Sequence, residues 1–598
     1  MEFSRLFDIA DYQLRLEPKD VALAGRENGA WQTWSTARVV EIRDRLSIGL
    51  RNRGLKAGDR VAILAHCGSP EWLVADLALM QAGMVPVPIH ATSRIEEIAQ
   101  IYTDAGFRAC FVSDVNMLQN IKVAAPDLEF LFAFGKIESA VAWEELLAET
   151  TDSQVLKTMR AETTETTLAT ILYTSGTTGE PKGVMLTHAN IVSNVKAMLA
   201  IVPFEENAVG LSFLPMSHIL ERMVNYVYLA AGVSIHYVDS IDKLPGYLRE
   251  VRPHIISAVP RILERMYESL QERRERAGWL GRKVFDWSIA LGEKFPFTGE
   301  HDMPFLYTIK RLVADVLVYR RWRKAMGGRL RGIAVGAAAL QPRLGRLFSA
   351  AGIDVREGYG LSETSPVVSF NRFEPGGVHF GTAGIPVPGV EVRIAKQEAG
   401  MPGGEIEVRG PNVMQGYWNK PEATAAKFTS DGWLRTGDLG HFEHKRFLRI
   451  TGRVGEVFKT STGKFVSPAF VEQQLLRSHF ISQCFAAGAN QPYVAALIVP
   501  NFAHLESWCR DNNVHWTAPE YMVHNPMVEK LFRSEIDVIN ESHLSGVEAV
   551  RRHVLIPGAW TTANGLLTPT MKLKRRDIEA QYQGEMIELF RKTLETEL

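Results

Sequence analysis

Cysteine is scarce in this sequence, and long apolar runs are absent. The 598 residues include four cysteines, and none of them forms a C-x-x-C pair. So few thiols in a chain of this length exclude a disulfide-stabilised scaffold and are typical of a reducing, cytoplasmic compartment. No stretch reaches the roughly 18 apolar residues of a membrane-spanning helix, and the start has no apolar run of signal-peptide length. We therefore expect a soluble cytoplasmic protein, peripheral at the inner face of a membrane at most.

An excess of charge of either sign is also absent. Lys and Arg number 67 and Asp and Glu 68, so the formal net charge is -1. This balance gives no global attraction to polyanions, and we expect no nucleic-acid partner. Apolar residues make up 46% and charged residues 23% of the chain, which is ordinary globular usage and excludes a disordered or fibrous protein.

Periodic patterns indicate the fold class. Strand-like runs alternate with helical ones in the first part of the chain, a rhythm typical of an α/β fold with a parallel sheet. The expected strands are 60–65, 84–89, 107–113, 167–173, 233–238 and 254–258. Residues 264–331 have the pattern of a mostly helical insertion with a basic second half.

The pattern changes twice more toward the C-terminus. Short strands with Gly and Pro turns after Gly381 indicate a β-rich subdomain, and a hairpin and helices after Arg453 indicate a separate α+β domain. Single cores stop growing near about 250–300 residues, so more than one domain is expected. We predict an α/β protein with a large N-terminal domain over 1–453, built of α/β layers with a β-rich subdomain, and a small C-terminal α+β domain over 454–598.

A glycine- and hydroxyl-rich loop, 173–183 (YTSGTTGEPKG), follows the apolar strand 167–173. Thr187 is placed to cap a helix that begins near Ala189. A loop between a strand and a helix offers free backbone N–H groups to a phosphate chain, which indicates a nucleotide site.

Side chains of the same loop add donors and a cation. The hydroxyls and glycines are Thr174, Ser175, Gly176, Thr177, Thr178 and Gly179. Lys182 supplies the positive charge, but Glu180 and Pro181 separate it from the second glycine, which excludes a Walker A loop. A flexible surface turn, the alternative, explains the glycines but not the hydroxyls and the lysine.

Four further segments follow this loop in order. They are 358–364 (GYGLSET), 432–438 (GWLRTGD), 451–468 (containing TGR and KTSTGKFVSP) and 567–576 (LTPTMKLKRR). Together with the loop they resemble the ordered motifs of the acyl-adenylate-forming superfamily, over nearly the whole chain. The resemblance implies an AMP-binding ligase that activates a carboxylic acid with ATP and Mg²⁺ to an acyl-AMP.

The resemblance also assigns the residues of the nucleotide site. It implies that Glu363 and Thr174 hold Mg²⁺, for which carboxylate oxygens are suitable ligands. It implies that Ser362 contacts the α-phosphate, and that Asp438 and Arg453 lie near the ribose. Tyr359 offers a flat face to a purine, with core packing as the alternative. The full nucleotide set is Thr174, Ser175, Gly176, Thr177, Thr178, Gly179, Lys182, Gly336, Gly358, Tyr359, Ser362, Asp438, Arg453, Lys459 and Lys572.

Lys572 aligns with the family's catalytic lysine in the small domain, and we predict that it acts with Lys182 and Glu363. A cation placed at developing negative charge stabilises a transition state. Charge alone does not distinguish Lys572 from Lys574 and its neighbours, so its spacing from the following Arg-Arg pair decides the choice.

Two segments resemble the acyl pocket of fatty acyl-CoA synthetases. His218, in 211–222 (LSFLPMSHILER), corresponds to a histidine beside the acyl tunnel, although a satisfied structural histidine is the alternative. Ala337 and Ala338, after the expected strand 332–335, correspond to a small-residue turn that lines the pocket, although a tight packing turn explains them equally.

The small domain is mobile in this family, and the resemblance places Gly455 at its hinge. The usual residue at this position is Asp or Lys. Glycine still allows the backbone to rotate, but it cannot make a charged contact that would hold one orientation of the small domain. Gly463 and Phe465 correspond to positions that contact CoA.

The insertion, the chain length and the C-terminal motif resemble long-chain fatty acid–CoA ligases, so we expect fatty acid, ATP and CoA as substrates. Three alternatives stay open: an acyl-AMP ligase that loads a carrier protein, a CoA ligase for an aromatic or medium-chain acid, and a catalytically silent lipid-binding homologue. The basic stretch 310–331 predicts either peripheral membrane contact or a solvated basic face. The oligomeric state is open, with a homodimer as one option.

Overall fold

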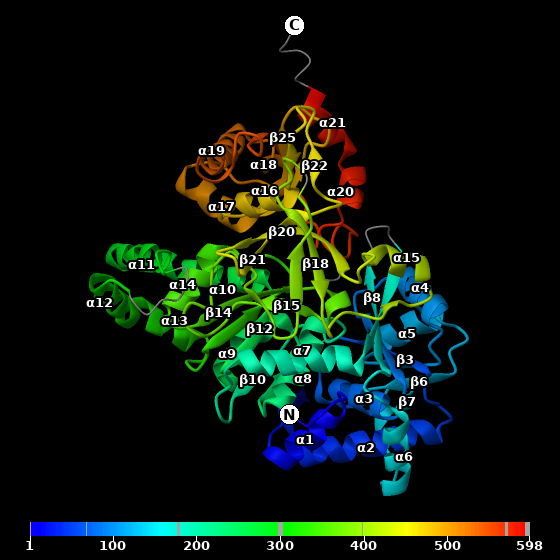
Figure 1. Ribbon diagram of the computed structural model, residues 1–598. Coiled ribbons are helices and arrows are strands. Elements are labelled where there is room, and N and C mark those ends of the chain that lie inside the picture. The colour runs from blue at the N-terminus through cyan, green and yellow to red at the C-terminus, as the bar shows by residue number, and fades with distance from the viewer. Residues whose placement is uncertain are drawn as a thin grey trace. The chain divides into compact units, whose positions relative to one another are not determined.

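The computed structural model describes residues 2–66, 68–175, 180–296, 303–397, 399–568 and 572–591. The chain packs as two compact units (Figure 1). The large unit comprises Met1–Val392, Val408–Leu434 and Phe442–Leu448, and the small unit comprises Arg393–Glu407, Arg435–His441 and Arg449–Leu598. The α/β class predicted from the sequence is confirmed. The domain boundary after residue 453 stays a prediction.

A nine-stranded sheet runs through the large unit in the order β16-β15-β14-β13-β12-β10-β11-β1-β2. Its strands are β1 (Leu23–Glu27), β2 (Ala30–Trp34), β10 (Val209–Ser212), β11 (Ser234–Tyr237), β12 (Ile255–Ala258), β13 (Gly332–Val335), β14 (Asp354–Gly360), β15 (Val367–Phe370) and β16 (Ile385–Pro386). The pairs from β1 through β11, β10, β12 and β13 to β14 are parallel, while β2, β15 and β16 join antiparallel.

A second sheet of the large unit is parallel throughout, in the order β4-β3-β5-β6-β7. Its strands are β3 (Arg60–Ala65), β4 (Val85–His90), β5 (Ala109–Val112), β6 (Phe130–Ala133) and β7 (Val141–Ala142). Helix α3 (Pro70–Gln81) contacts strands of both sheets, and its side chains are buried except for Glu71. The parallel arrangement predicted for 60–65, 84–89 and 107–113 is confirmed.

The parallel strand–loop–helix predicted around residues 167–173 is wrong. β8 (Leu168–Ser175) pairs antiparallel with β9 (Pro181–Thr187), and β9 also pairs with β19 (Gly416–Tyr417). The residues after the loop return along β8 because Val184 and Leu186 alternate into the core. Helix α7 (His188–Ile201) begins only after this strand, and Thr187 caps it as predicted.

Helices cover these sheets and form the insertion. The remaining helices of the large unit are α1 (Asp8–Leu16), α2 (Thr36–Asn52), α4 (Ile95–Ala105), α5 (Val115–Ala124), α6 (Ser153–Glu162), α8 (Ile219–Ala230), α9 (Leu244–Val251), α10 (Pro260–Glu275), α11 (Trp279–Gly292), α12 (Phe305–Ala314), α13 (Arg320–Ala325), α14 (Pro342–Ala350) and α15 (Pro421–Lys427). A π-helical turn, Asp315–Tyr319, joins α12 to α13. Side chains of α10 to α14 share one core with β10, β12, β13 and β14.

Strands β17 (Glu391–Ile394), β18 (Gly404–Arg409), β20 (Leu434–Glu443) and β21 (Phe447–Arg453) form a four-stranded sheet in the predicted β-rich segment. The small unit contains a hairpin, β22 (Phe458–Lys459) and β23 (Phe465–Val466), and a sheet of β24 (Ile481–Ala487), β25 (Val494–Pro500) and β26 (Val550–Leu555). Its helices are α16 (Pro468–Leu475), α17 (Phe502–Asp511), α18 (Pro519–Met522), α19 (Pro526–His543), α20 (Arg575–Gln581) and α21 (Gln583–Arg591).

Alternation along β24 and β25 gives the small unit two cores. Cys484 and Ile498 pack with residues of α16, α17 and α19, while Phe485 and Leu497 pack with residues of α20 and α21. This is the period-two pattern of a sheet that is covered on both faces. Within the described part of the chain, no helix is long and apolar enough to cross a membrane.

Candidate active site

The β8–β9 hairpin carries the predicted phosphate-binding loop. Thr174 pairs with Lys182 across the hairpin, and both side chains are half-buried. The predicted residues Gly176, Thr177, Thr178 and Gly179 and the side chain of Ser175 lie outside the described structure. Next to the Thr174–Lys182 pair, the hydroxyl of Tyr173 donates to Asp104 Oδ2 of α4 at 2.6 Å. Burial raises the pKa of Tyr173, so this hydroxyl keeps its proton and anchors the hairpin.

Lys182 and Glu363 are brought together by a residue that the sequence did not single out, Tyr417. The Tyr417 hydroxyl donates to Glu363 Oε1 at 2.7 Å, and Lys182 Nζ lies 5.5 Å from the centroid of the Tyr417 ring. Burial, and then the adjacent Glu363 carboxylate, raise the pKa of Tyr417. The protonated phenol therefore orients the carboxylate beside the cation of the hairpin.

This cluster has a simple origin in the chain. Tyr417 pairs with Val184 of β9, which places it next to Lys182, and Glu363 lies in a short 3₁₀ turn, Ser362–Thr364, after β14. The Glu363 carbonyl accepts from the Met414 N–H at 2.9 Å, which holds that turn against the segment leading into β19. In the sequence, Tyr417 is only an aromatic residue after a glycine, which does not indicate a function. Its contacts with Lys182 and Glu363 arise from the pairing of strands that are distant in the chain.

Glu363 is the residue that suits Mg²⁺. Groups of three or more His, Cys, Asp or Glu side chains able to hold a metal are absent from the part of the chain that the structure describes. Mg²⁺ in nucleotide sites needs only one or two carboxylates, because phosphates and water complete its coordination. A half-buried Glu363 whose Oε1 is fixed by Tyr417 fits that requirement. The assignment of Thr174 as a second ligand stays a prediction.

Strand β14 and the turn after β13 form the predicted adenine-side elements. A Cβ atom at Gly358 would lie 2.8 Å from Phe370 Cδ2, so only glycine allows β14 to approach β15 this closely before Tyr359. In the turn, Ala337 has a φ of 69°, a left-handed conformation that is uncommon for a residue other than glycine. Glu357 Oε1 accepts from the Leu340 N–H at 3.0 Å and ties this turn to β14.

The segment around His218 lies against that turn. His218 is the N-cap of α8, and its Nδ1 accepts from the Leu220 N–H at 3.3 Å. A Cβ at Gly336 would lie 3.2 Å from Leu220 Cδ2, which places the predicted Gly336 turn beside the start of α8. The structural role left open for His218 is therefore present, and its role in an acyl pocket stays a prediction, as do those of Ala337 and Ala338.

Helix α8 also buries a carboxyl group that the sequence did not single out. Glu221 is fully buried and accepts from Ser212 Oγ of β10 at 2.7 Å and from Ser257 Oγ of β12 at 2.5 Å. Burial raises the pKa of Glu221 to about 7. The Glu221 side chain, three residues after His218, therefore joins α8 to the adjacent strands β10 and β12.

Asp438 and Arg453 of the small unit form an ion pair. Arg453 Nε donates to Asp438 Oδ1 at 2.7 Å; the Asp438 side chain is 8% exposed and that of Arg453 41%. The Asp438 N–H donates to Thr436 Oγ1 at 3.1 Å, and the Gly437 N–H donates to Glu405 Oε1 at 3.0 Å. The two residues that the sequence places near a ribose are therefore brought together on β20 and β21.

The β22–β23 hairpin carries Lys459, predicted to bind the nucleotide, and the predicted CoA-side residues Gly463 and Phe465. Lys459 pairs with Phe465, and its Nζ lies 5.1 Å from the centroid of the Phe465 ring. Gly463 turns the hairpin with a φ of 82°. Gly455 is exposed in the turn after β21, and an added side chain there would meet no atom within 4 Å.

Lys572 is exposed in the small unit. Leu567 forms a bridge with Leu573, and the Thr568 N–H donates to the Lys572 carbonyl at 2.8 Å, so the segment of Lys572 pairs with residues 567 and 568. The next helix anchors this segment, because Arg575 pairs with the buried Glu472 at 2.8 Å. The exposed Lys572 thus lies three residues before an arginine that is paired with a buried carboxylate of α16.

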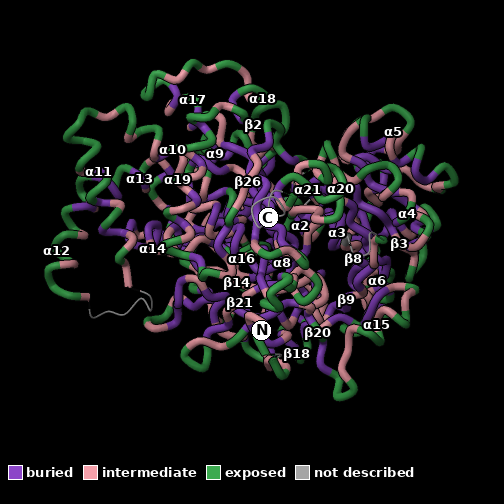
Figure 2. Tube along the Cα trace, turned by 90° about the horizontal axis from the view of Figure 1, so that it is seen from above, coloured by how far each residue is buried: buried purple, intermediate pink, exposed green. Residues whose placement is uncertain are grey.

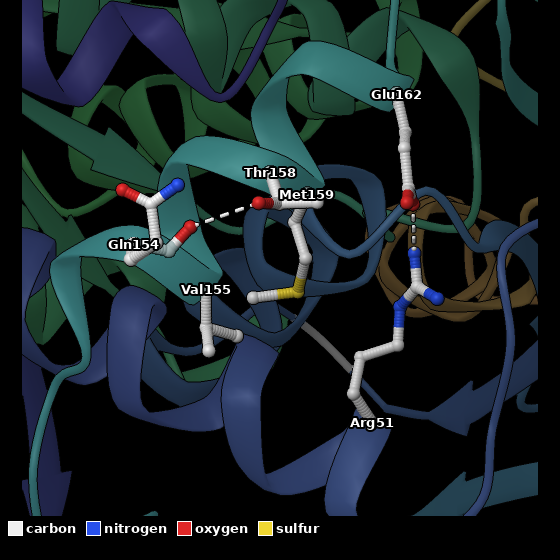
Figure 3. Close-up of a pocket in the computed structure, with 6 residues that line it drawn as sticks. All are labelled: Arg51, Gln154, Val155, Thr158, Met159 and Glu162. Atoms are coloured by element: carbon white, nitrogen blue, oxygen red, sulfur yellow. Dashed lines mark hydrogen bonds and ion pairs between the residues drawn. The ribbon is translucent and has the colours of Figure 1, made fainter.

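A pocket of about 300 Å³ lies between α2 and α6 (Figure 3). The Arg51–Glu162 ion pair, 2.8 Å long, crosses its rim, and Met159 and Val155 contribute apolar surface. None of the predicted site residues lines this pocket, so it has no part in the candidate site.

Comparison with known proteins decides the family. The model of the AMP-binding enzyme family matches residues 11–418. This chain belongs to the AMP-binding enzyme family. It is 33% identical to the long-chain-fatty-acid–CoA ligase FadD15 of Mycobacterium bovis, over 94% of this chain and 93% of that protein. It is 27% identical to long-chain-fatty-acid–CoA ligase 1 of Cavia porcellus, over 98% of this chain and 86% of that one.

Solved structures show the same fold. ATP-bound MatB from Rhodopseudomonas palustris superposes with a TM-score of 0.71 at 22% identity, covering 97% of this chain and 99% of that one. The adenylation domain of a carboxylate reductase from Mycobacterium chelonae superposes with a TM-score of 0.76 at 21% identity, covering 98% and 91%. The family match and the 33% identical relative, rather than these structures, show that this chain is an adenylate-forming, acyl-activating ligase.

Proposed function

We propose that this AMP-binding enzyme is a long-chain fatty acid–CoA ligase. The observation that carries the proposal is the Lys182–Tyr417–Glu363 cluster, which joins the predicted phosphate-loop lysine to the predicted metal ligand. Identity of 33% with a ligase of that name over nearly the full length supports the choice of substrates. ATP, CoA and a fatty acid are the proposed substrates, and Mg²⁺ is the proposed metal.

In the first half-reaction, a carboxylate oxygen of the fatty acid attacks the α-phosphorus of ATP. The bond from that phosphorus to the bridging oxygen breaks, and pyrophosphate leaves with its electron pair. Mg²⁺, when bound, supplies positive charge to the phosphates. Lys182 contributes a fixed cation on the hairpin, and Tyr417 holds Glu363 in position. We assign Tyr359 and the turn at Gly336 to the adenine side and Ser362 to the α-phosphate.

In the same step, Lys572 provides a cation for the substrate carboxylate and the α-phosphate. Such a group stabilises negative charge that increases in the transition state. Asp438 accepts hydrogen bonds from the ribose, and Arg453 holds that carboxylate. His218, Ala337 and Ala338 border the acyl chain in this proposal.

In the second half-reaction, the CoA thiolate attacks the acyl carbon and AMP leaves with the bridging oxygen. We propose that rotation about Gly455 exchanges Lys572 for the β22–β23 hairpin between the two steps. Gly463 and Phe465 of that hairpin then lie along the CoA arm, and Lys459 contacts the nucleotide or the pantetheine.

Pyrophosphate release with fatty acids of increasing chain length, with and without CoA, tests the proposal. We expect turnover that rises toward long chains and requires CoA for release of AMP from the enzyme. Turnover without preference for long chains contradicts the substrate, and equal rates without CoA favour a ligase that uses another acceptor. Absence of pyrophosphate with every acid indicates a catalytically silent protein.

A further inference from the structure

The outward face of α12 and the following π-helical turn carries an unusual apolar stripe. Its members are Phe305, Leu306, Ile309, Leu312, Val313, Val316 and Leu317, which are 78%, 69%, 42%, 63%, 46%, 67% and 40% exposed. Their spacing of three and four residues places them on one side of the helix. Contiguous exposed apolar surface of this kind marks an interaction site. We call these seven residues the α12 stripe.

The opposite side of the same segment already holds it in the large unit. Ala314, Val318 and Trp322 are buried in the core shared by α10 to α14, and the Tyr319 hydroxyl donates to the Ser288 carbonyl at 2.5 Å. Figure 1 and Figure 2 both show α12 beside α11 at the edge of the large unit, and the colours of Figure 2 show exposed residues along α12. The stripe is therefore a second apolar face of this segment, and it is not buried in the core of the large unit.

Unpaired positive charge accompanies the stripe. Lys310, Arg320, Arg321 and Lys324 are exposed and form no ion pair among the residues that the structure describes. Asp315, the acidic residue of this stretch, is already paired with Arg323 at 2.5 Å. We call the four unpaired residues the α12 cations; their charge is available to an external partner.

We propose that the α12 stripe and the α12 cations dock this enzyme onto an anionic lipid surface. The apolar side chains enter the boundary between headgroups and acyl chains, and the cations contact lipid phosphates, as an amphipathic helix does when it lies in a membrane interface. A second copy of the chain fits less well, because a self-complementary contact brings the same unpaired cations together. The proposal goes beyond the ligase function and does not depend on it.

Sedimentation of the full-length chain with vesicles tests this docking. We expect binding to vesicles of phosphatidylcholine mixed with phosphatidylglycerol, little binding to phosphatidylcholine alone, and weaker binding as salt screens the charges. Leu312→Ser with Val316→Ser should lower the partition coefficient at least about ten-fold, because both side chains lose apolar burial. Arg320→Gln with Arg321→Gln should lower it about five-fold per cation removed.

Matched controls use residues of the same types elsewhere on the surface. Leu16→Ser with Val123→Ser replaces side chains that are 64% and 67% exposed, and Arg15→Gln with Arg53→Gln replaces two exposed cations. Both controls should bind vesicles as the unchanged chain does. Thermal unfolding of every variant checks that the fold is retained.

Three outcomes overturn the proposal. One is absence of binding of the unchanged chain to anionic vesicles. Another is equal binding by the stripe variant and its control. The third is a dimer of the unchanged chain in lipid-free buffer, seen by analytical ultracentrifugation, that is lost in the stripe variant although vesicle binding is unaltered. In that case a second copy of the chain, and not a lipid surface, occupies the stripe. None of these measurements depends on pyrophosphate release. A lack of vesicle binding is therefore distinguished from a lack of ligase activity.

Discussion

The large and small units hold their candidate site residues in different ways. In the large unit, Lys182, Tyr417 and Glu363 come from segments far apart in the sequence, and strand pairing with a hydrogen bond to a carboxylate fixes them. In the small unit, Asp438 is buried and paired with Arg453, but Lys572 and Gly455 are exposed. The difference teaches that substitutions in the Lys182–Tyr417–Glu363 cluster change both packing and chemistry, whereas those at the exposed Lys572 and Gly455 leave the packing of side chains unchanged.

The largest effect is expected at Lys572. Lys572→Ala should reduce pyrophosphate release about 10²- to 10³-fold, because a cation that acts on transition-state charge is lost. Thermal unfolding should be unchanged, since the side chain is exposed. Arg576→Ala, which removes another exposed cation of the same segment, is the control and should retain activity. Equal losses of activity in both variants would show that the net positive charge of the segment, and not the position of Lys572, causes the effect.

Gly455→Pro should separate the two half-reactions. Proline fixes φ, so rotation at this turn becomes restricted. Thioester formation should slow at least about ten-fold while acyl-AMP formation changes little, measured by single-turnover assays of each step. Gly546→Pro, at another exposed turn of the small unit, is the control. An equal loss in both half-reactions removes Gly455 from the hinge.

Glu221→Gln should change the pH dependence of stability in the large unit. The ordinary Glu pKa is 4.5, and burial raises that of Glu221 to about 7. Between these values the unfolded chain releases this proton and the folded chain keeps it, so the free energy of unfolding falls as pH rises, by roughly 3 kcal/mol at most. The decline levels off above pH 7.

The glutamine variant lacks this titration, so its stability should fall less than that of the unchanged chain between pH 4.5 and 7. Urea unfolding at several pH values gives the measurement, with Glu149→Gln as an exposed control. Parallel curves for the Glu221 variant and the unchanged chain contradict a buried, protonated carboxyl group.

The smallest effect is expected at Tyr417. Tyr417→Phe should lower kcat/KM for MgATP about ten-fold, because a hydrogen bond to a carboxylate is lost while the ring remains. Tyr247→Phe is matched, since the Tyr247 hydroxyl donates to Asp239 at 2.9 Å away from the cluster. If both variants lose the same activity, Tyr417 has no specific role in holding Glu363.

Local patterns in the sequence predicted much of the secondary structure. Residues 60–65 and 332–335 form the expected strands β3 and β13, and Thr187 caps α7. The β8–β9 hairpin was missed because the sequence pattern predicted that the loop leads directly into the helix capped by Thr187. In the structure, the seven-residue strand β9 lies between the loop and this helix. Tyr417, Glu357 and Glu221 were missed because their partners lie on other strands or turns, which only the packing of the chain brings next to them.

The sequence by itself determined the family, the α/β class and the chemical groups available to the site, because motif order, side-chain identity and local periodicity are all properties of the linear chain. Only the tertiary structure decided that Tyr417 joins Lys182 to Glu363, that Glu221 is buried, and that the α12 stripe is exposed. The physical reason is that burial and hydrogen bonding depend on contacts between segments far apart in sequence, and side-chain period alone does not specify those contacts.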